Sequence, residues 1–217
     1  MASWWQGWLD LLAPPICAGC GATVNRDSAL CERCTRALTT AGPVSPCPTR
    51  LDACLAAVDY SGAAEDWIRR FKYPRPGLAG LDPAALAVAR SLARRAAARV
   101  PGRPDLVVPV PLHPRRLRAR GFNPACQLAR DVAREACVPL APTALVRLRD
   151  TPSQTGLDRP ARARNVRHAF EARRPVPMRI WLVDDVVTTG ATLSEAARAL
   201  RRAGARHITA VCAARTP

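Results

Sequence analysis

Two adjacent carboxylates and a short turn of threonine and glycine lie next to each other near the carboxyl end of the chain. Asp184 and Asp185 follow an apolar run at residues 180–183 that is typical of a buried strand. The turn, which leads into an alanine-rich helical segment, consists of Thr188, Thr189, Gly190, Ala191 and Thr192. The N–H groups of such a turn attract a phosphate dianion, and neighbouring carboxylates accept hydrogen bonds from sugar hydroxyls. The pattern predicts a phosphate site with a diol site beside it; the alternative is a buried strand followed by an ordinary acidic loop.

Four cysteines near the amino end form two Cys-x-x-Cys pairs. Cys17 pairs with Cys20 and Cys31 with Cys34, and ten residues separate the two pairs. Thiolates at this spacing can bind one ion within a tight turn, and two such pairs complete a tetrahedron. We therefore expect a structural zinc site. A catalytic zinc is disfavoured because four thiolates leave no position for water. Reduced thiols and two disulfides are the alternatives.

From about residue 57 onward, apolar runs alternate with helical segments. The expected strands are residues 57–60, 106–111, 145–149, 180–183 and 208–213, and the expected helices are residues 63–71, 83–99, 125–137 and 194–203. This alternation predicts an α/β fold with a mostly parallel sheet flanked by helices. Residues 113–124 are expected to be an arginine-rich loop and residues 151–167 a long mobile loop. We expect a zinc-binding domain with an N-terminal helix at residues 1–55 and an α/β domain at residues 56–217.

The charge of the chain indicates an anionic partner. The net charge is +16, and of the 33 basic residues only Lys72 is a lysine. The preference for arginine suggests a GC-rich coding sequence and is weak support for any function. The excess of positive charge is not explained in that way, so we expect the partner to be a phosphorylated small molecule or a nucleic acid.

The amino end gives no sign of export. It lacks a basic start and has Asp10 within its apolar stretch, which makes a poor signal peptide. No apolar run approaches the roughly 20 residues of a transmembrane helix. We therefore expect a cytoplasmic location, where cysteines stay reduced. Trp5 and Trp8 lie at helical spacing; such a helix packs on its own domain or, less simply, rests on a membrane or a partner.

Further motifs extend these observations over nearly the whole chain. They are YSG at 60–62, IRRFKYPRPG at 68–77, VVPVPLHPRRLRARGFNPA at 107–125, RLRDTPSQTGLDRPARARNVRHAF at 147–170 and DDVVTTGAT at 184–192. The last of these resembles the 5-phosphoribosyl-1-pyrophosphate (PRPP) motif of type I phosphoribosyltransferases. With the four cysteines in front, the whole order resembles the competence protein ComF family. That resemblance implies a zinc domain joined to a type I phosphoribosyltransferase fold. It also implies a role with transforming single-stranded DNA and a helicase-like partner.

The resemblance also implies roles for individual residues. The 5-phosphate of PRPP would lie in the turn at residues 188–192, and the two aspartates would face the ribose hydroxyls directly or through Mg²⁺. Pyrophosphate would meet a cationic clamp and a closing lid at residues 159–167. The clamp candidates are Arg115, Arg116 and Arg120, although each could equally be a solvated surface charge. By its rarity rather than by the resemblance, Lys72 could be a lysine because a compact ammonium is needed, or it could be a chance survivor. Gln154 could orient a base or a phosphate, or it could simply be solvated in its loop.

Two departures from the family pattern limit what is carried over. Many relatives have a further pair of cysteines where this chain has only Cys47 and Cys54, so a second metal site is not expected. Purine-salvage enzymes have an acidic residue at the position of Thr188, which disfavours salvage of hypoxanthine or guanine.

Two functions follow from these observations. The first is a Mg²⁺-dependent phosphoribosyltransferase that acts on an unidentified acceptor, with turnover left open. The second is a non-catalytic, nucleic-acid-binding accessory protein whose ribose-phosphate pocket senses nucleotides. Phe71, Tyr73 and Phe122 could stack bases in that case; the alternative is that most of the aromatic residues belong to the core.

Overall fold

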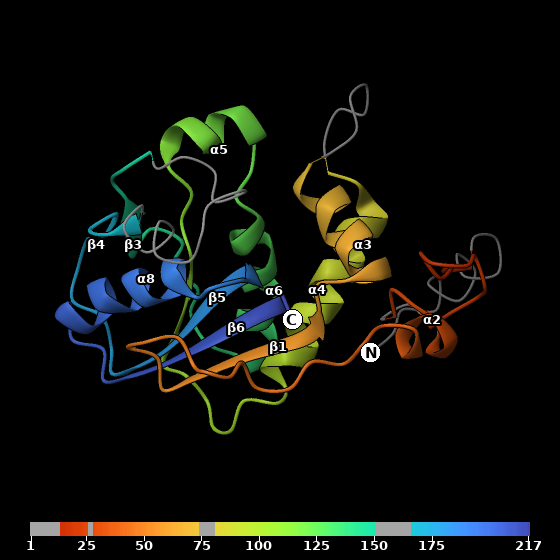
Figure 1. Ribbon diagram of the computed structural model, residues 1–217, viewed down its shortest axis with the longest axis horizontal. Helices are drawn as coiled ribbons and strands as arrows, with labels where there is room; N and C mark the ends of the chain where they lie inside the picture. Colours follow the sequence, from red (N-terminus) through yellow and green to blue (C-terminus); the bar gives the residue numbers. More distant parts are fainter. Residues whose placement is uncertain (1–13, 26–27, 74–80, 151–165) are drawn as a thin grey trace.

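The central sheet of the molecule is parallel, as the sequence predicts. The computed structural model describes residues 14–25, 28–73, 81–150 and 166–217. Its main sheet has four parallel strands in the order β1-β6-β5-β2. Their bounds are Ala53–Asp59 for β1, Leu106–Pro109 for β2, Arg179–Val187 for β5 and His207–Arg215 for β6. Figure 1 shows β1, β6 and β5 side by side.

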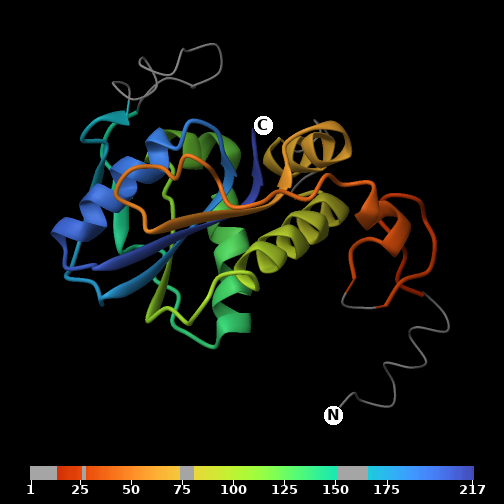
Figure 2. The ribbon, with the colours of Figure 1, turned by 60° about the horizontal axis from the view of Figure 1, so that its bottom comes forward.

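Alternate residues of the strands face two separate hydrophobic layers. Val107 and Trp181 pack with the helices of one layer, whereas Val108 and Leu182 pack in the other. The first layer contains α3 (Gly62–Lys72), α4 (Pro83–Ala97) and α6 (Pro124–Ala136), and the second contains α8 (Ala191–Arg202). Figure 2 shows α8 on one side of the sheet and α4 and α6 on the other. Because side chains alternate along a strand, a sheet covered on both faces explains the nearly continuous apolar runs in the sequence.

A small antiparallel hairpin stands apart from the main sheet. It consists of β3 (Leu145–Arg147) and β4 (Phe170–Ala172). The sequence predicted a strand at residues 145–149, and the observed strand ends two residues earlier. Both of its strands contact α8, so the hairpin packs beside that helix.

The arginine-rich segment after β2 is a helix, and the prediction of a loop at residues 113–124 was wrong. Helix α5 spans Pro114–Arg120 and buries none of its residues. Pro114 stands in the first turn, the Nδ1 atom of His113 accepts a hydrogen bond from the N–H of Arg115, and Gly121 ends the helix with a φ of 82°. These are local start and stop signals. An apolar periodicity cannot reveal a helix that has no buried face.

The acidic pair lies within a strand and not after its end, which corrects a second expectation. β5 continues to Val187 because its neighbour β6 is equally long: Asp184 is in register with Cys212 and Val187 with Arg215. The extra pairing fixes the backbone of both aspartates.

The amino-terminal part reaches the sheet through an extended segment. Helix α2 (Glu32–Arg36) belongs to the cysteine-rich part. The segment 39–44 then runs antiparallel to the outer edge of β1, with Thr40 opposite Val58 and Pro43 opposite Leu55. β1 starts at Ala53, and the division of the chain after residue 55 stays a prediction.

The sequence led us to expect a helix at the amino end and no helix that crosses a membrane. The tryptophan-rich helix expected at the amino end lies outside the described residues. Among the helices that the structure does describe, none is long and apolar enough to cross a membrane.

Candidate functional site

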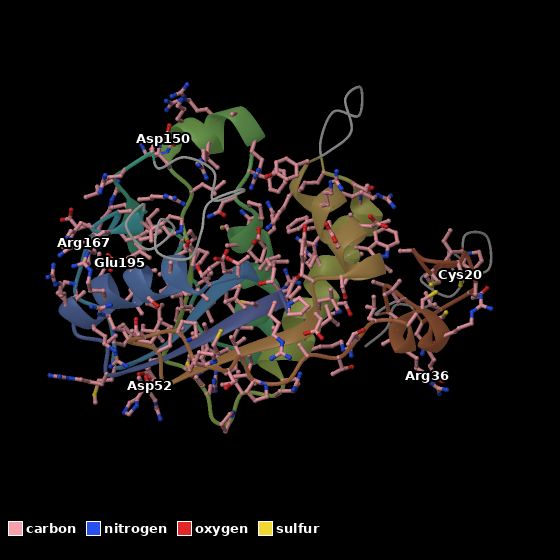
Figure 3. The ribbon with its side chains drawn as sticks, in the orientation of Figure 1. Cys20, Arg36, Asp52, Asp150, Arg167 and Glu195 are labelled. Atoms are coloured by element: carbon pink, nitrogen blue, oxygen red, sulfur yellow. The ribbon has the colours of Figure 1, made fainter. Side chains whose placement is uncertain are left out.

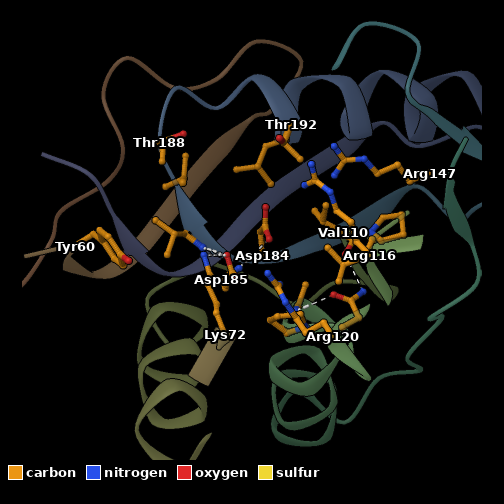
Figure 4. Close-up of a pocket in the computed structure, with 18 of the residues that line it drawn as sticks. Tyr60, Lys72, Val110, Arg116, Arg120, Arg147, Asp184, Asp185, Thr188 and Thr192 are labelled. Carbon is orange, nitrogen blue, oxygen red and sulfur yellow. Dashed lines mark hydrogen bonds and ion pairs between the residues drawn. The ribbon is translucent and has the colours of Figure 1, made fainter. Parts of the chain in front are cut away.

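A cavity of about 620 Å³ opens where the acidic pair lies, at the carboxyl end of β5. Its walls come from parts of the chain that are far apart in the sequence: the ends of α3 and β5, the loop after β2, α5, β3 and the first turn of α8. In parallel α/β sheets, ligands bind outside the carboxyl ends of the strands. Figure 4 shows Asp184 near the centre of this cavity, with Thr192 and Arg147 above it and Lys72 and Arg120 below it.

The turn after β5 presents the amino end of α8 to the cavity. Gly190 precedes the helix with a φ of 74°, and the first turn of the helix has no acidic residue. Four of the five residues predicted from the motif line the cavity, namely Thr188, Gly190, Ala191 and Thr192. Thr189 does not line it, and its Oγ1 accepts a hydrogen bond from the N–H of Ala191 at 3.4 Å. The N–H groups and the helix dipole make this end of α8 attractive to an anion.

Gly190 has a second reason to be a glycine. A Cβ atom at this position would lie 2.4 Å from Cγ and 2.6 Å from Cβ of Pro48. A left-handed backbone and so close a neighbour together leave no room for a side chain. The segment that joins the cysteine-rich part to the sheet therefore contacts the turn directly.

The two aspartates are held in place by the backbone. The N–H of Asp185 donates to Asp184 Oδ1 at 2.9 Å, and the N–H of Val186 donates to Asp185 Oδ1 at 2.6 Å. Burial and the neighbouring charge of Asp185 raise the pKa of Asp184 to about 7, although Lys72, the N–H of Asp185 and Arg147 act in the opposite direction. A pair of this kind favours cations and hydroxyl donors nearby.

The structure places the single lysine at this pair. The Nζ atom of Lys72 lies 2.9 Å from Asp185 Oδ1. Lys72 is the last residue of α3 and lines the same cavity.

The predicted arginine clamp is brought together only in part. Arg116 and Arg120 line the cavity, whereas Arg115 does not. The side chain of Arg115 is 80% exposed, and its Nη1 lies 3.5 Å from Asp150 Oδ2. Arg116 Nε lies 3.6 Å from the other oxygen of Asp150. Asp150 thus ties the start of α5 to the end of β3.

Arg147 is a cavity residue that sequence reasoning missed. It is 8% exposed, its guanidinium lies 5.4 Å from the ring centroid of Phe170, and it lines the cavity from β3. Burial and the nearby charge of Arg116 lower its pKa. The period of the strand was a usable signal, because Arg147 stands two residues after buried Leu145 and therefore on the same face.

Two predicted features cannot be placed. Gln154 and most of the expected lid at residues 159–167 lie outside the described residues.

The acidic pair offers Mg²⁺ a partial set of ligands. Mg²⁺ commonly takes one or two carboxylates together with phosphate oxygens and water. Asp184 and Asp185 are such carboxylates, and Asp185 is already paired with Lys72. The residues therefore fit Mg²⁺ only together with a phosphorylated ligand.

The four cysteines of the two Cys-x-x-Cys pairs converge at one point. The Sγ atoms of Cys17, Cys20, Cys31 and Cys34 all lie within 4.8 Å of one another. Four thiolates around zinc, each at about 2.3 Å, would stand about 3.8 Å apart, and the Sγ atoms of Cys20 and Cys31 are 3.6 Å apart. Within the described residues this is the one such group of potential metal ligands, and neither Cys47 nor Cys54 joins it.

The chemistry of the cluster also fits a cation. Burial raises the pKa of Cys17, but the N–H groups of Cys31, Cys20 and Gly19 outweigh it and lower the pKa to about 6. Hydrogen bonds with Cys20 and Cys17 raise the pKa of Cys34 to about 12. Because four thiolates repel one another at this distance, all four are stable together only around a metal ion, and with no open position the zinc would be structural.

Comparisons with known families cover both parts of the chain. A double zinc ribbon domain matches residues 8–50, and a phosphoribosyl transferase domain matches residues 119–217. The second match and the parallel sheet confirm the expected phosphoribosyltransferase-like fold. The first match and the four-cysteine cluster support structural zinc.

Similar proteins are found over nearly the full length. DNA utilization protein YhgH of Escherichia coli (strain K12) is 33% identical over 208 residues, which covers 93% of this chain and 90% of the relative. Competence protein F of Haemophilus influenzae is 36% identical over 109 residues, which covers 48% of each chain. Among solved structures, glutamine PRPP amidotransferase from B. subtilis is 20% identical with a TM-score of 0.47, covering 68% of this chain and 30% of that one.

Replacing one cysteine of the cluster should release the metal. We expect Cys17→Ser protein to lose the zinc that the wild type holds at about one ion per chain, because three thiolates bind zinc less tightly than four. Atomic absorption on purified protein measures this. Cys137→Ser is the matched control, since Cys137 is exposed and lies outside the cluster. Stoichiometric zinc in the Cys17→Ser variant would contradict the assignment.

Proposed function

Because the chain belongs to the family of DNA utilization protein YhgH and competence protein F, we propose that it binds PRPP or a related phosphoribosyl compound in the cavity at the end of β5. One observation carries the proposal. The acidic pair and the amino end of α8 are adjoining walls of one cavity, in which five basic side chains outnumber three carboxylates. This arrangement suits a ligand that has both a sugar diol and several phosphate charges.

Each part of such a ligand has a chemically matched wall. The 5-phosphate would bind the N–H groups at Gly190, Ala191 and Thr192. The ribose hydroxyls would donate to the aspartates. The pyrophosphate would face Arg116 and Arg120 from α5, together with Arg147 from β3, where guanidinium groups can bind phosphate in a bidentate manner.

Mg²⁺ is the cofactor proposed with the pyrophosphate. Asp184 would hold it together with phosphate oxygens, and the ion would neutralise charge on the leaving group. Loss of pyrophosphate leaves positive charge on the ribose, which neighbouring carboxylates stabilise. Phosphoribosyl transfer to an acceptor is therefore the reaction class that the site suits. Thr188, which is exposed and offers no acidic group, does not favour a purine acceptor.

A second function is favoured by the surface of α5. Arg115 and Arg118 are exposed on this helix beside exposed Leu117. At its end, the guanidinium of Arg120 lies 4.8 Å from the ring centroid of Tyr73, whose side chain is 62% exposed. Phe71 is fully buried and cannot stack on a base. We propose that this surface binds single-stranded nucleic acid in the cytoplasm, with a helicase-like protein as the partner.

Single substitutions can distinguish the role of Arg116, which lines the cavity, from that of Arg118, which lies on the same helix outside the cavity. Arg116→Ala should weaken PRPP binding roughly tenfold to a hundredfold, because a hydrogen bond to a charged group is worth about 1.5–3 kcal/mol. Arg118→Ala removes the same charge from the same helix outside the cavity and should leave affinity within about twofold. Isothermal titration calorimetry measures both. Equal losses in the two variants would reject the assigned cavity.

Nucleic-acid binding should depend on the exposed arginines of α5 and not on the arginine that lines the cavity. Gel-shift titration with a single-stranded oligonucleotide should show affinity that falls steeply with salt, and Arg115→Ala with Arg118→Ala should lower the slope of log K against log salt by about 0.7 per lost phosphate contact. PRPP affinity should not change in that double variant. An absence of binding at low salt would refute this second function.

A further inference from the structure

Lys72 and Asp185 form a close, shielded ion pair inside the cavity. The Nζ atom lies 2.9 Å from Asp185 Oδ1, and the side chains are 19% and 14% exposed. Figure 4 shows the ammonium group directed at the acidic pair from α3, across the cavity from the turn that begins α8.

The helix leaves the lysine little freedom to move away. α3 buries Trp67 and Ile68, and Phe71, the residue before the lysine, is fully buried. The Phe71 ring lies 5.9 Å from that of Phe122. With this anchor, the last residue of the helix is fixed beside β5, and its side chain reaches the carboxylates.

The surroundings keep this ammonium charged. Burial alone would lower the pKa of Lys72, but the charges of Asp185 and Asp184 and the hydrogen bond with Asp185 raise it. At 2.9 Å from Asp185 Oδ1, the lysine places a positive charge where two carboxylates need one. A compact ammonium reaches a single oxygen, whereas a planar guanidinium presents a wider fork. This difference gives a physical reason for the one lysine in a chain of arginines.

We propose that Lys72 is the resident cation of the acidic pair: it occupies Asp185 where a divalent ion would otherwise bind, so that the pair holds the ribose hydroxyls with little dependence on Mg²⁺. The inference rests on the proposed phosphoribosyl site and deepens it. Mg²⁺ is then recruited by the pyrophosphate of the ligand and by Asp184, and not by the free protein. A ligand with a ribose phosphate and no pyrophosphate should need no divalent ion.

Ribose 5-phosphate and Mg²⁺ are the probes for the test. In the wild type, calorimetry should give a ribose 5-phosphate affinity that changes by less than about twofold between EDTA and millimolar Mg²⁺. In Lys72→Gln, affinity in EDTA should fall about tenfold or more, and Mg²⁺ should restore it. Direct titration of the free proteins with Mg²⁺ should show tighter binding to Lys72→Gln than to the wild type.

Arg69→Gln is the matched control. Arg69 belongs to the same helix and lines the same cavity, so its loss removes one positive charge there. It should leave the Mg²⁺ dependence of ribose 5-phosphate binding as in the wild type, and it should raise the affinity of the free protein for Mg²⁺ by much less than Lys72→Gln does.

Removing one partner of a buried pair can prevent folding. The double variant Lys72→Gln, Asp185→Asn removes both charges and provides a folded comparison. It should bind Mg²⁺ no better than the wild type, because the carboxylate that the lysine shields is gone. Tight Mg²⁺ binding by this double variant would overturn the inference.

The results separate this inference from the proposed function. If wild-type protein needs Mg²⁺ for ribose 5-phosphate as strongly as Lys72→Gln does, the role of Lys72 is refuted while the phosphoribosyl site stands. If no variant binds ribose 5-phosphate in either condition, the proposed function fails. In that case the Mg²⁺ titration of the free proteins still tests the role of Lys72. Equal Mg²⁺ affinities for wild type and Lys72→Gln would overturn that role.

Discussion

Two neighbouring carboxylates at the end of a buried strand repel each other, and the rest of the site is arranged around that repulsion. Asp184 and Asp185 are fixed by the pairing of β5 with β6 and cannot turn away. Their charges are tolerated because cations converge on them from other elements: Lys72 from α3 and Arg147 from β3. The same cations give the cavity its preference for anionic ligands. Charge balance at the acidic pair thus connects the fold with the binding chemistry.

The turn after the acidic pair connects the two parts of the chain in a similar way. Gly190 must be a glycine both for its backbone angle and for its contact with Pro48. Pro48 belongs to the segment that leads from the zinc cluster to β1, and Arg99 holds that segment by donating to the carbonyl of Ala41 at 2.6 Å. The connecting segment therefore lies beside the site at Pro48, whereas Figure 3 shows Cys20 and Arg36 of the cysteine-rich part at one end of the molecule.

The features that the sequence predicted are those encoded locally. The acidic pair and the glycine turn are consecutive, and the four cysteines have a spacing that metal chemistry requires. The helix after the turn was expected at residues 194–203, whereas α8 begins three residues earlier, at Ala191. The parallel sheet followed from alternating strands and helices. Helix α5 was missed because no face of it is buried, although Pro114 and Gly121 marked its ends.

Contacts between residues that are far apart in the sequence could not be predicted from it. Arg147 is a cavity residue only because the β3–β4 pair packs against α8, which places β3 at the wall of the cavity. Lys72 attracted notice by its rarity, but its pairing with Asp185 depends on how α3 packs. Arg115 and Arg116 are adjacent in sequence, yet the helix directs one toward solvent and the other into the cavity, and only a correct secondary structure could separate them.

A crystal structure with ribose 5-phosphate tests the central claim most directly. The account predicts phosphate oxygens at hydrogen-bonding distance, about 3 Å, from the N–H groups of Gly190, Ala191 and Thr192. It also predicts ribose hydroxyls on Asp184 and Asp185, with Lys72 still beside the pair. A ligand bound elsewhere, or aspartates that make no contact with the sugar, would contradict it.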